Sequence, residues 1–122
     1  MRVLIVEDEP IIALEIESIV QDRLPQACVV CATSVSAALL LIADELCMAM
    51  LDVDVTDGKT YPLADELRLR GVPFAFVSGA LTEDLPERLS HAAFVRKPFC
   101  TADILRTIDA LEAIGGRVEE KE

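Results

Sequence analysis

The sequence predicts an α/β protein with a five-stranded parallel sheet and helices on both of its faces. Three observations support this fold class. Short apolar segments alternate with helical patterns, each apolar segment is continuous rather than alternating with polar residues, and no repeat or linker breaks the order. A chain of 122 residues fits one domain with a single core. We expect that domain over residues 1–114, followed by a charged, flexible tail over residues 115–122.

The first half of the chain supplies three strands. Each is a short aliphatic run: Arg2 to Val6, Cys28 to Ala32, and Met48 to Leu51. A helix is expected from Pro10 to Leu24, because apolar residues recur there at helical spacing and proline suits a first turn. A second helix is expected to run to about Leu46, because Thr33, Ser34 and Ser36 offer capping hydroxyls.

The second half repeats the alternation. Tyr61 to Arg70 predicts a short helix that Gly71 closes. Strands are expected at Pro73 to Val77 and at Ala93 to Val95. A helix interrupted by Pro86 is expected over residues 83–91, and a last helix over residues 103–114.

The charge of the chain restricts its partners. Asp and Glu number 22 against 11 Lys and Arg, which gives a net charge of −11 and disfavours binding to nucleic acid. No apolar run is long enough to span a membrane and no signal peptide is visible, so we expect a cytoplasmic protein without a membrane partner. Cys28 and Cys31 are three residues apart on a strand, which favours a structural role over a shared metal.

Polar residues follow four of the five expected strands. The first strand ends in Glu7, Asp8 and Glu9, and the third in Asp52. The same edge should carry two further groups, Ser78 after the fourth strand and Lys97 after the fifth. In a parallel sheet all these residues meet at one edge, where function gathers in such folds.

The chemistry of this set is that of a metal and phosphoryl site. Clustered carboxylates repel by about 4 kcal/mol per pair at close range, and Mg²⁺ relieves that repulsion. A lysine and a hydroxyl are suited to holding phosphoryl oxygens. One aspartate is then free to act as a nucleophile and form an aspartyl phosphate.

Four motifs in this order resemble the receiver domain of two-component response regulators. They are "VEDEP", "LDVD", "VSG" and "VRKPF", and the resemblance spans about residues 2 to 114. It resembles single-domain receivers of the chemotaxis-regulator type, and "PFAFVSG" is similar to a bacterial subgroup linked to general stress signalling. The resemblance implies a flavodoxin-like sheet with strand order 2-1-3-4-5.

The resemblance also implies roles for individual residues. Asp52 matches the phosphoacceptor, and Lys97 and Ser78 match the groups that bind the phosphoryl oxygens. Ser78 and the aromatic Phe94 match the switch pair, although Phe94 lacks the hydroxyl of the tyrosine often found there. The implied magnesium ligands complete the set: Glu7 through water, Asp8, Asp52 and the backbone carbonyl of Asp54.

The implied function is that of a signalling switch rather than an enzyme. A partner histidine kinase or phosphotransfer protein donates the phosphoryl group, which is slowly lost again. No DNA-binding segment follows residue 114. We therefore expect the protein either to pass the signal to a downstream effector protein or to act as a sink for phosphoryl groups. The protein is expected to be a monomer or a weak dimer.

The sequence also allows two other functions, a phosphohydrolase and a phosphate-independent interaction module. "DVDVT" also resembles the D-x-D-x-T motif of haloacid dehalogenase-like phosphohydrolases, with Asp52 as nucleophile, but there the motif follows the first strand. A phosphate-independent interaction module would need an inert site. Asp57 before Gly58 is best explained as a turn residue, and His91 as a surface or packing residue.

Overall fold

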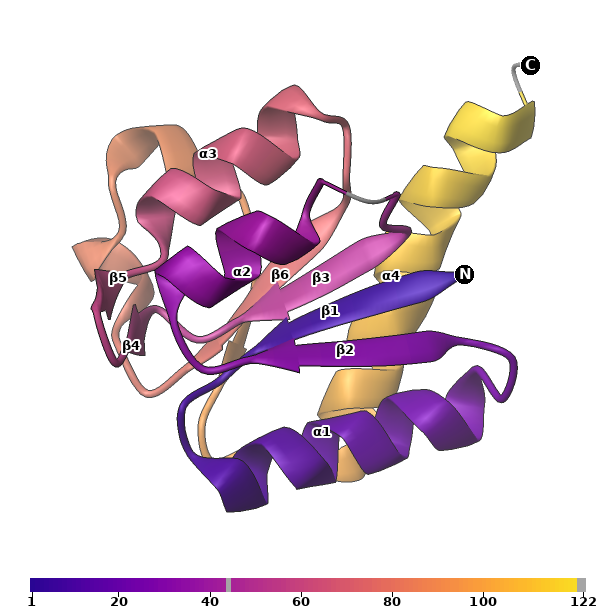
Figure 1. Ribbon diagram of the computed structural model, residues 1–122, viewed down its shortest axis with the longest axis horizontal. Coiled ribbons are helices and arrows are strands. Elements are labelled where there is room, and N and C mark those ends of the chain that lie inside the picture. The colour runs from indigo at the N-terminus through magenta and orange to yellow at the C-terminus, as the bar shows by residue number, and fades with distance from the viewer. Residues whose placement is uncertain (44, 121–122) are drawn as a thin grey trace.

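The computed structural model describes residues 1–43 and 45–120 and has three layers, with one sheet between two pairs of helices (Figure 1). The strands of this sheet are β1 (Arg2–Val6), β2 (Cys28–Ala32), β3 (Met48–Leu51), β6 (Phe74–Ser78) and β7 (Ala93–Arg96). All neighbouring strands are parallel, and their order is β2-β1-β3-β6-β7. The predicted fold class and strand order are therefore confirmed.

The helices cover the two faces of the sheet in pairs. They are α1 (Pro10–Arg23), α2 (Val35–Leu41), α3 (Tyr61–Leu69) and α4 (Thr101–Glu120). Val3 and Ile5 of β1 face a core that α1 and α4 complete, whereas Leu4 and Val6 face the core shared with α2 and α3. Successive residues of a strand point to opposite faces, so a continuous apolar strand is what two covered faces require.

Two helix ends follow the predicted capping chemistry. The Ala37 N–H donates to Ser34 Oγ over 3.1 Å, which caps the start of α2. After α3, Gly71 takes a positive φ of 70° while its own N–H and that of Val72 bond back to Arg68 and Leu67. Glycine reaches this left-handed conformation without strain, so it ends the helix as expected.

The connection between α2 and β3 differs from the prediction. The helix ends at Leu41 rather than near Leu46, because the chain must turn back to pair Met48 with Val3 of β1. Leu46 is still buried in the core, but from a loop. The Ile42 carbonyl at the end of the helix accepts a hydrogen bond of 2.9 Å from Arg70 Nη1.

The connection between β6 and β7 also differs. Instead of a helix over residues 83–91, it forms two 3-10 turns, η1 (Thr82–Asp84) and η2 (Glu87–Leu89). Pro86 explains the break, because a proline lacks the N–H for a helical bond and pushes the preceding residue into an extended conformation. Leu85 has that extended conformation, and Leu85 and Leu89 cover the sheet in place of a helix.

The last helix is longer than predicted. It begins at Thr101 and continues to Glu120, so its expected end at Ile114 is wrong. The charged residues after Gly115 and Gly116 are good helix formers, and they continue the helix. The flexibility expected of residues 115–122 stays a prediction, and residues 121 and 122 lie outside the described part of the chain.

The cysteines of the expected C-x-x-C spacing are both free thiols on β2, at the edge of the sheet. Partial burial, together with the Glu17 carboxylate 3.8 Å away, raises the pKa of the Cys31 thiol to about 11. This thiol is therefore protonated at neutral pH, which disfavours redox chemistry. Within residues 1–43 and 45–120, no helix combines the length and the apolar character needed to cross a membrane.

Candidate functional site

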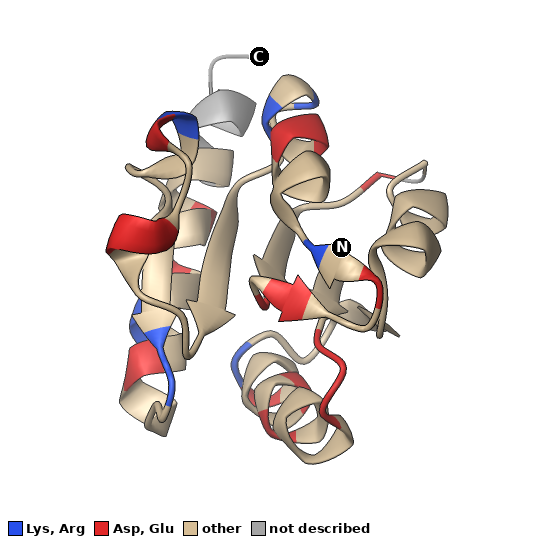
Figure 2. Cartoon of the chain, turned by 90° about the vertical axis from the view of Figure 1, so that its left-hand side faces the viewer, with Lys and Arg blue, Asp and Glu red and all other residues tan. Residues whose placement is uncertain are grey.

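The carboxyl ends of the strands lie together on one side of the molecule, which Figure 2 views directly. Backbone hydrogen bonds continue the sheet for one residue past β1, β3 and β7. The Glu7 N–H donates to Ala32 O over 3.0 Å. The Asp52 N–H donates to Val6 O over 2.8 Å, and the Lys97 N–H donates to Ser78 O over 2.9 Å. These bonds fix the backbone from which the site side chains project.

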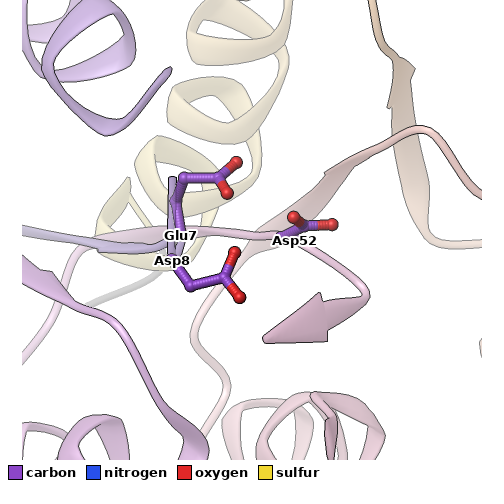
Figure 3. Close-up of side chains that lie close together, drawn as sticks. All are labelled: Glu7, Asp8 and Asp52. Atoms are coloured by element: carbon purple, nitrogen blue, oxygen red, sulfur yellow. The ribbon is translucent and has the colours of Figure 1, made fainter. Parts of the chain in front are cut away.

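Three carboxylates meet at this edge. Glu7, Asp8 and Asp52 each place one oxygen within 4.8 Å of the others. The side chains of Glu7 and Asp8 extend to the same side of the chain, towards Asp52 (Figure 3). Glu7 and Asp52 are buried, whereas Asp8 is more accessible. The predicted convergence of these acids is therefore present in the fold.

The Lys97 ammonium lies between two of these acids. Lys97 Nζ is 2.6 Å from Glu7 Oε1 and 3.0 Å from Asp52 Oδ2. Its side chain is 14% exposed, and that of Glu7 is 1% exposed, so this is a partly buried ion-pair network rather than a surface one. The peptide bond from Lys97 to Pro98 is cis. Lys97 supplies the positive charge that allows two carboxylates to be buried side by side.

Burial sets the protonation behaviour of this network. Burial raises the pKa of Glu7 above its usual value, and its hydrogen bonds to Lys97 and to the Glu9 N–H oppose that rise only in part. Burial on its own lowers the pKa of Lys97, but the hydrogen bonds to Glu7 and Asp52 outweigh it and the net pKa is raised. Lys97 therefore remains charged throughout the physiological range.

The acids that follow Asp52 point elsewhere. Asp54 and Lys59 pair across a small antiparallel hairpin of β4 (Asp54–Val55) and β5 (Gly58–Lys59), and their side chains form an exposed ion pair of 2.6 Å. The Asp54 carboxylate is thus paired with Lys59. The role of the Asp54 backbone carbonyl as a metal ligand stays a prediction. Asp57 occupies the expected turn, where Gly58 has a φ of 126°.

Ser78 and Phe94 are the two expected switch residues. Ser78 is buried, and its Oγ accepts a hydrogen bond of 3.2 Å from the Ala80 N–H. Phe94 is half-buried and packs against Phe76, with the ring centroids 6.3 Å apart. Both residues lie on neighbouring strands, β6 and β7, which join them to Asp52 and Lys97 through the sheet.

The donor set fits a hard divalent cation. Carboxylate and carbonyl oxygens are the ligands that Mg²⁺ takes in proteins, usually with several waters. The oxygens of Asp8 and Asp52 lie close enough together to share one ion, and Asp8 is open to water. When bound, Mg²⁺ supplies positive charge that offsets the charge of a phosphoryl group.

Two features of the site were not evident in the sequence. Thr60 is fully buried, and its Oγ1 donates to the Asp52 carbonyl over 2.5 Å, while its N–H donates to Val53 O over 2.9 Å. Asp57 bonds to the start of α2, more than twenty residues away in the chain. Both contacts depend on tertiary folding, and neither residue belongs to a motif that indicates them.

Several solved structures have the same fold as this chain over nearly its whole length. SdrG from Sphingomonas melonis Fr1 is 32% identical, with 91% of this chain and 95% of SdrG covered at a TM-score of 0.78. A CheY-like response regulator receiver domain protein from Methanospirillum hungatei is 25% identical, with 95% and 97% covered at a TM-score of 0.79. TrrA from Thermotoga maritima, solved in complex with Mg²⁺ and BeF, is 18% identical, with 90% and 97% covered and a TM-score of 0.77.

No protein-family model matches the sequence, and a comparison with curated proteins found no match. The fold and the acids at the strand ends nevertheless define a receiver-type α/β protein. Its similarity to SdrG extends over nearly the whole length of both chains. The chain belongs to the response regulator receiver family.

The phosphohydrolase alternative is not favoured. The matched structures described above include a response regulator and a CheY-like receiver domain protein. The second aspartate of the D-x-D-x-T motif acts as acid and base in that family, but here the Asp54 carboxylate is exposed and paired with Lys59.

Proposed function

We propose that this receiver accepts a phosphoryl group on Asp52 from a partner histidine kinase or phosphotransfer protein, with Mg²⁺ as cofactor. The observation that carries the proposal is the position of the Asp52 carboxylate, beside Glu7 and Asp8 and within hydrogen-bonding distance of Lys97. An Asp52 oxygen attacks phosphorus, the O–P bond forms, and the N–P bond to the donor imidazole breaks. The electron pair stays with that imidazole, which takes up a proton from water.

The other site residues bind and orient in this scheme. Asp8, Asp52 and the Asp54 carbonyl hold the metal directly, and Glu7 holds it through water. Lys97 and Ser78 bind the phosphoryl oxygens. Phosphorylation adds roughly −1.5 to −2 charge at Asp52, so Lys97 gains a stronger partner than Glu7. TrrA was solved with Mg²⁺ and BeF, which supports a magnesium-dependent site in this fold.

Ser78 and Phe94 give the scheme an output. In this scheme Ser78 moves towards the phosphoryl oxygens, and Phe94, which already packs against Phe76, turns further inward from its half-buried position. This movement changes the surface formed by β7 and α4, which an effector protein then recognises. If the chain has no effector, the same chemistry drains phosphoryl groups from the kinase.

A protein donor is supported by the start of α1. Ile11 and Leu14 are 79% and 64% exposed, and they lie on the first two turns of the helix after Asp8. Exposed apolar residues next to a reactive site favour contact with a protein surface. Such a surface presents its phosphohistidine to Asp52 from the open side of the site.

The test is phosphorylation by acetyl phosphate, followed by intact mass. We expect one added phosphoryl group on the wild type with Mg²⁺, and none with EDTA. Asp52→Asn should remove the label. Asp65→Asn should keep it, because Asp65 lies on α3, is half-buried and pairs with Arg88 of η2. An unlabelled wild type would contradict the proposed function, and labelled Asp52→Asn protein would contradict the choice of acceptor.

A further inference from the structure

The β4–β5 hairpin lies between the proposed phosphoacceptor and α3, and it carries the Asp54 carbonyl. Two kinds of contact hold its base. Val53 and Val55 are buried in the core shared with α2 and α3, and Thr60 bonds to the carbonyls of Asp52 and Val53. These contacts are all made within or directly beneath the hairpin. They leave its tip, at Asp57 and Gly58, to be positioned by something else.

Asp57 connects that tip to a remote part of the chain. The Val35 N–H donates to Asp57 Oδ1 over 2.7 Å, and the Ser36 N–H donates to Asp57 Oδ2 over 3.1 Å. Both donors belong to the first turn of α2, where N–H groups have no partner within the helix. The hairpin and the start of α2 lie side by side in the fold (Figure 1). Asp57 therefore uses both carboxylate oxygens to join the hairpin to α2.

This connection leads back to the acid site. The residue that ends β2, Ala32, accepts a hydrogen bond of 3.0 Å at its carbonyl from the Glu7 N–H. The segment from Ala32 to Val35 thus bonds to the backbone of Glu7 at one end and to Asp57 at the other. The hairpin that carries Asp54 and the turn that carries Glu7 and Asp8 are held against the same segment.

We infer that Asp57 is a positioning residue for the metal, fixing the hairpin and with it the Asp54 carbonyl relative to Glu7 and Asp8. The inference rests on the proposed function, which assigns that carbonyl to Mg²⁺. The Asp57 carboxylate acts by holding the backbone of the hairpin against α2, and it is not one of the reacting groups. Its loss should therefore weaken metal binding and leave the chemistry intact once the metal is bound.

Ser34 offers a matched control. Its hydroxyl caps the same helix by accepting from the Ala37 N–H, and within the described part of the chain its other hydrogen-bonding neighbour is Ser36 of that helix. Ser34→Ala and Asp57→Ala both remove a partner of a first-turn N–H group of α2. Only Asp57→Ala also releases the hairpin. Any difference between these two variants reports on the connection and not on the stability of α2.

The experiment titrates Mg²⁺ into 15N-labelled wild type and both variants, following amide shifts at Asp8 and Val53. We expect Asp57→Ala to weaken Mg²⁺ binding roughly fivefold, at the low end of coupling between linked sites. Ser34→Ala should bind like the wild type. Asp57→Asn keeps one acceptor oxygen and should lie between wild type and Asp57→Ala, which also provides a variant if alanine prevents folding.

A second measurement separates positioning from chemistry. The rate of phosphorylation by acetyl phosphate should be lower for Asp57→Ala at low Mg²⁺ and equal to that of the wild type at saturating Mg²⁺. Equal Mg²⁺ affinities for Asp57→Ala and Ser34→Ala would overturn the inference, and so would a rate that stays low at saturation. If the wild type takes up no phosphate, the proposed function fails, while the Mg²⁺ titration still decides the role of Asp57.

Discussion

Two acidic regions lie within six residues of each other along the chain, and they have opposite environments. At the end of β3, Asp52 is buried beside Glu7 and faces the ammonium of Lys97. In the hairpin that follows, Asp54 and Asp57 are exposed. Asp54 pairs with Lys59 in solvent, and Asp57 accepts hydrogen bonds from backbone N–H groups. The same residue type thus has two roles in the proposed function, as phosphoacceptor in one region and as a structural acceptor of hydrogen bonds in the other.

The difference teaches that burial, more than charge density, distinguishes the proposed phosphoacceptor Asp52 from the acids of the hairpin. A buried carboxylate needs a partner because water no longer solvates it, and removing that partner costs several kcal/mol. An exposed pair is solvated in any case and contributes roughly 0 to 1 kcal/mol. Replacing Lys97 in one region and Lys59 in the other measures this difference in stability directly.

The largest stability effect is expected for Lys97→Met. It leaves Glu7 and Asp52 buried together without a counter-charge, so we expect a loss of about 3 kcal/mol in the free energy of unfolding. Urea unfolding at neutral pH with EDTA measures this loss, because EDTA keeps a metal from replacing the ammonium. Lys59→Met removes the exposed partner of Asp54 and should cost less than about 1 kcal/mol. Similar losses for the two variants would remove the distinction drawn between the regions.

A smaller effect is expected at the junction of the two regions. Thr60→Val keeps the shape of the buried side chain but leaves the Asp52 carbonyl without the hydroxyl bond, so we expect a loss of roughly 1 to 2 kcal/mol. Thr56 is exposed in the same hairpin, and Thr56→Val should change the stability by less than about 0.5 kcal/mol. Urea unfolding of both variants provides the comparison. A neutral Thr60→Val would mean that the hydroxyl does not hold the end of β3.

Much of the fold was predictable because strand burial leaves a local signal. The strands β1, β2 and β3 begin and end at the predicted residues. The strand β6 is shifted by one residue at both ends, and β7 ends one residue later than predicted. The ends of α2 and α4 and the 3-10 turns were not predicted correctly. Those boundaries depend on where the chain must turn to meet the sheet, and periodicity does not encode that.

The site likewise has contacts that the sequence predicts and contacts that it does not. The meeting of Glu7, Asp8, Asp52 and Lys97 follows from parallel topology, because each lies within two residues of the end of a strand. The contact of Lys97 with Glu7 depends on the course of a long side chain over 90 residues of sequence separation. The contact of Asp57 with α2 likewise depends on how two loops pack. Such details require coordinates, since no local pattern specifies which distant N–H group an acid will meet.

The smallest expected effect is the pH dependence that the exposed Asp57 gives to the stability of the protein. Hydrogen bonds from the Val35 and Ser36 N–H groups lower the pKa of Asp57 from its usual 3.8. A carboxyl whose pKa is lowered by folding stabilises the protein above its unfolded pKa, and this contribution is lost as pH falls through the folded value. The wild type should therefore exceed Asp57→Asn in urea midpoint near neutral pH, and the gap should narrow below about pH 4. Ser34→Ala removes a cap without a titrating group, so its gap to the wild type should stay constant over the same range. A constant gap for Asp57→Asn as well would show that its charge does not contribute to holding the hairpin against α2.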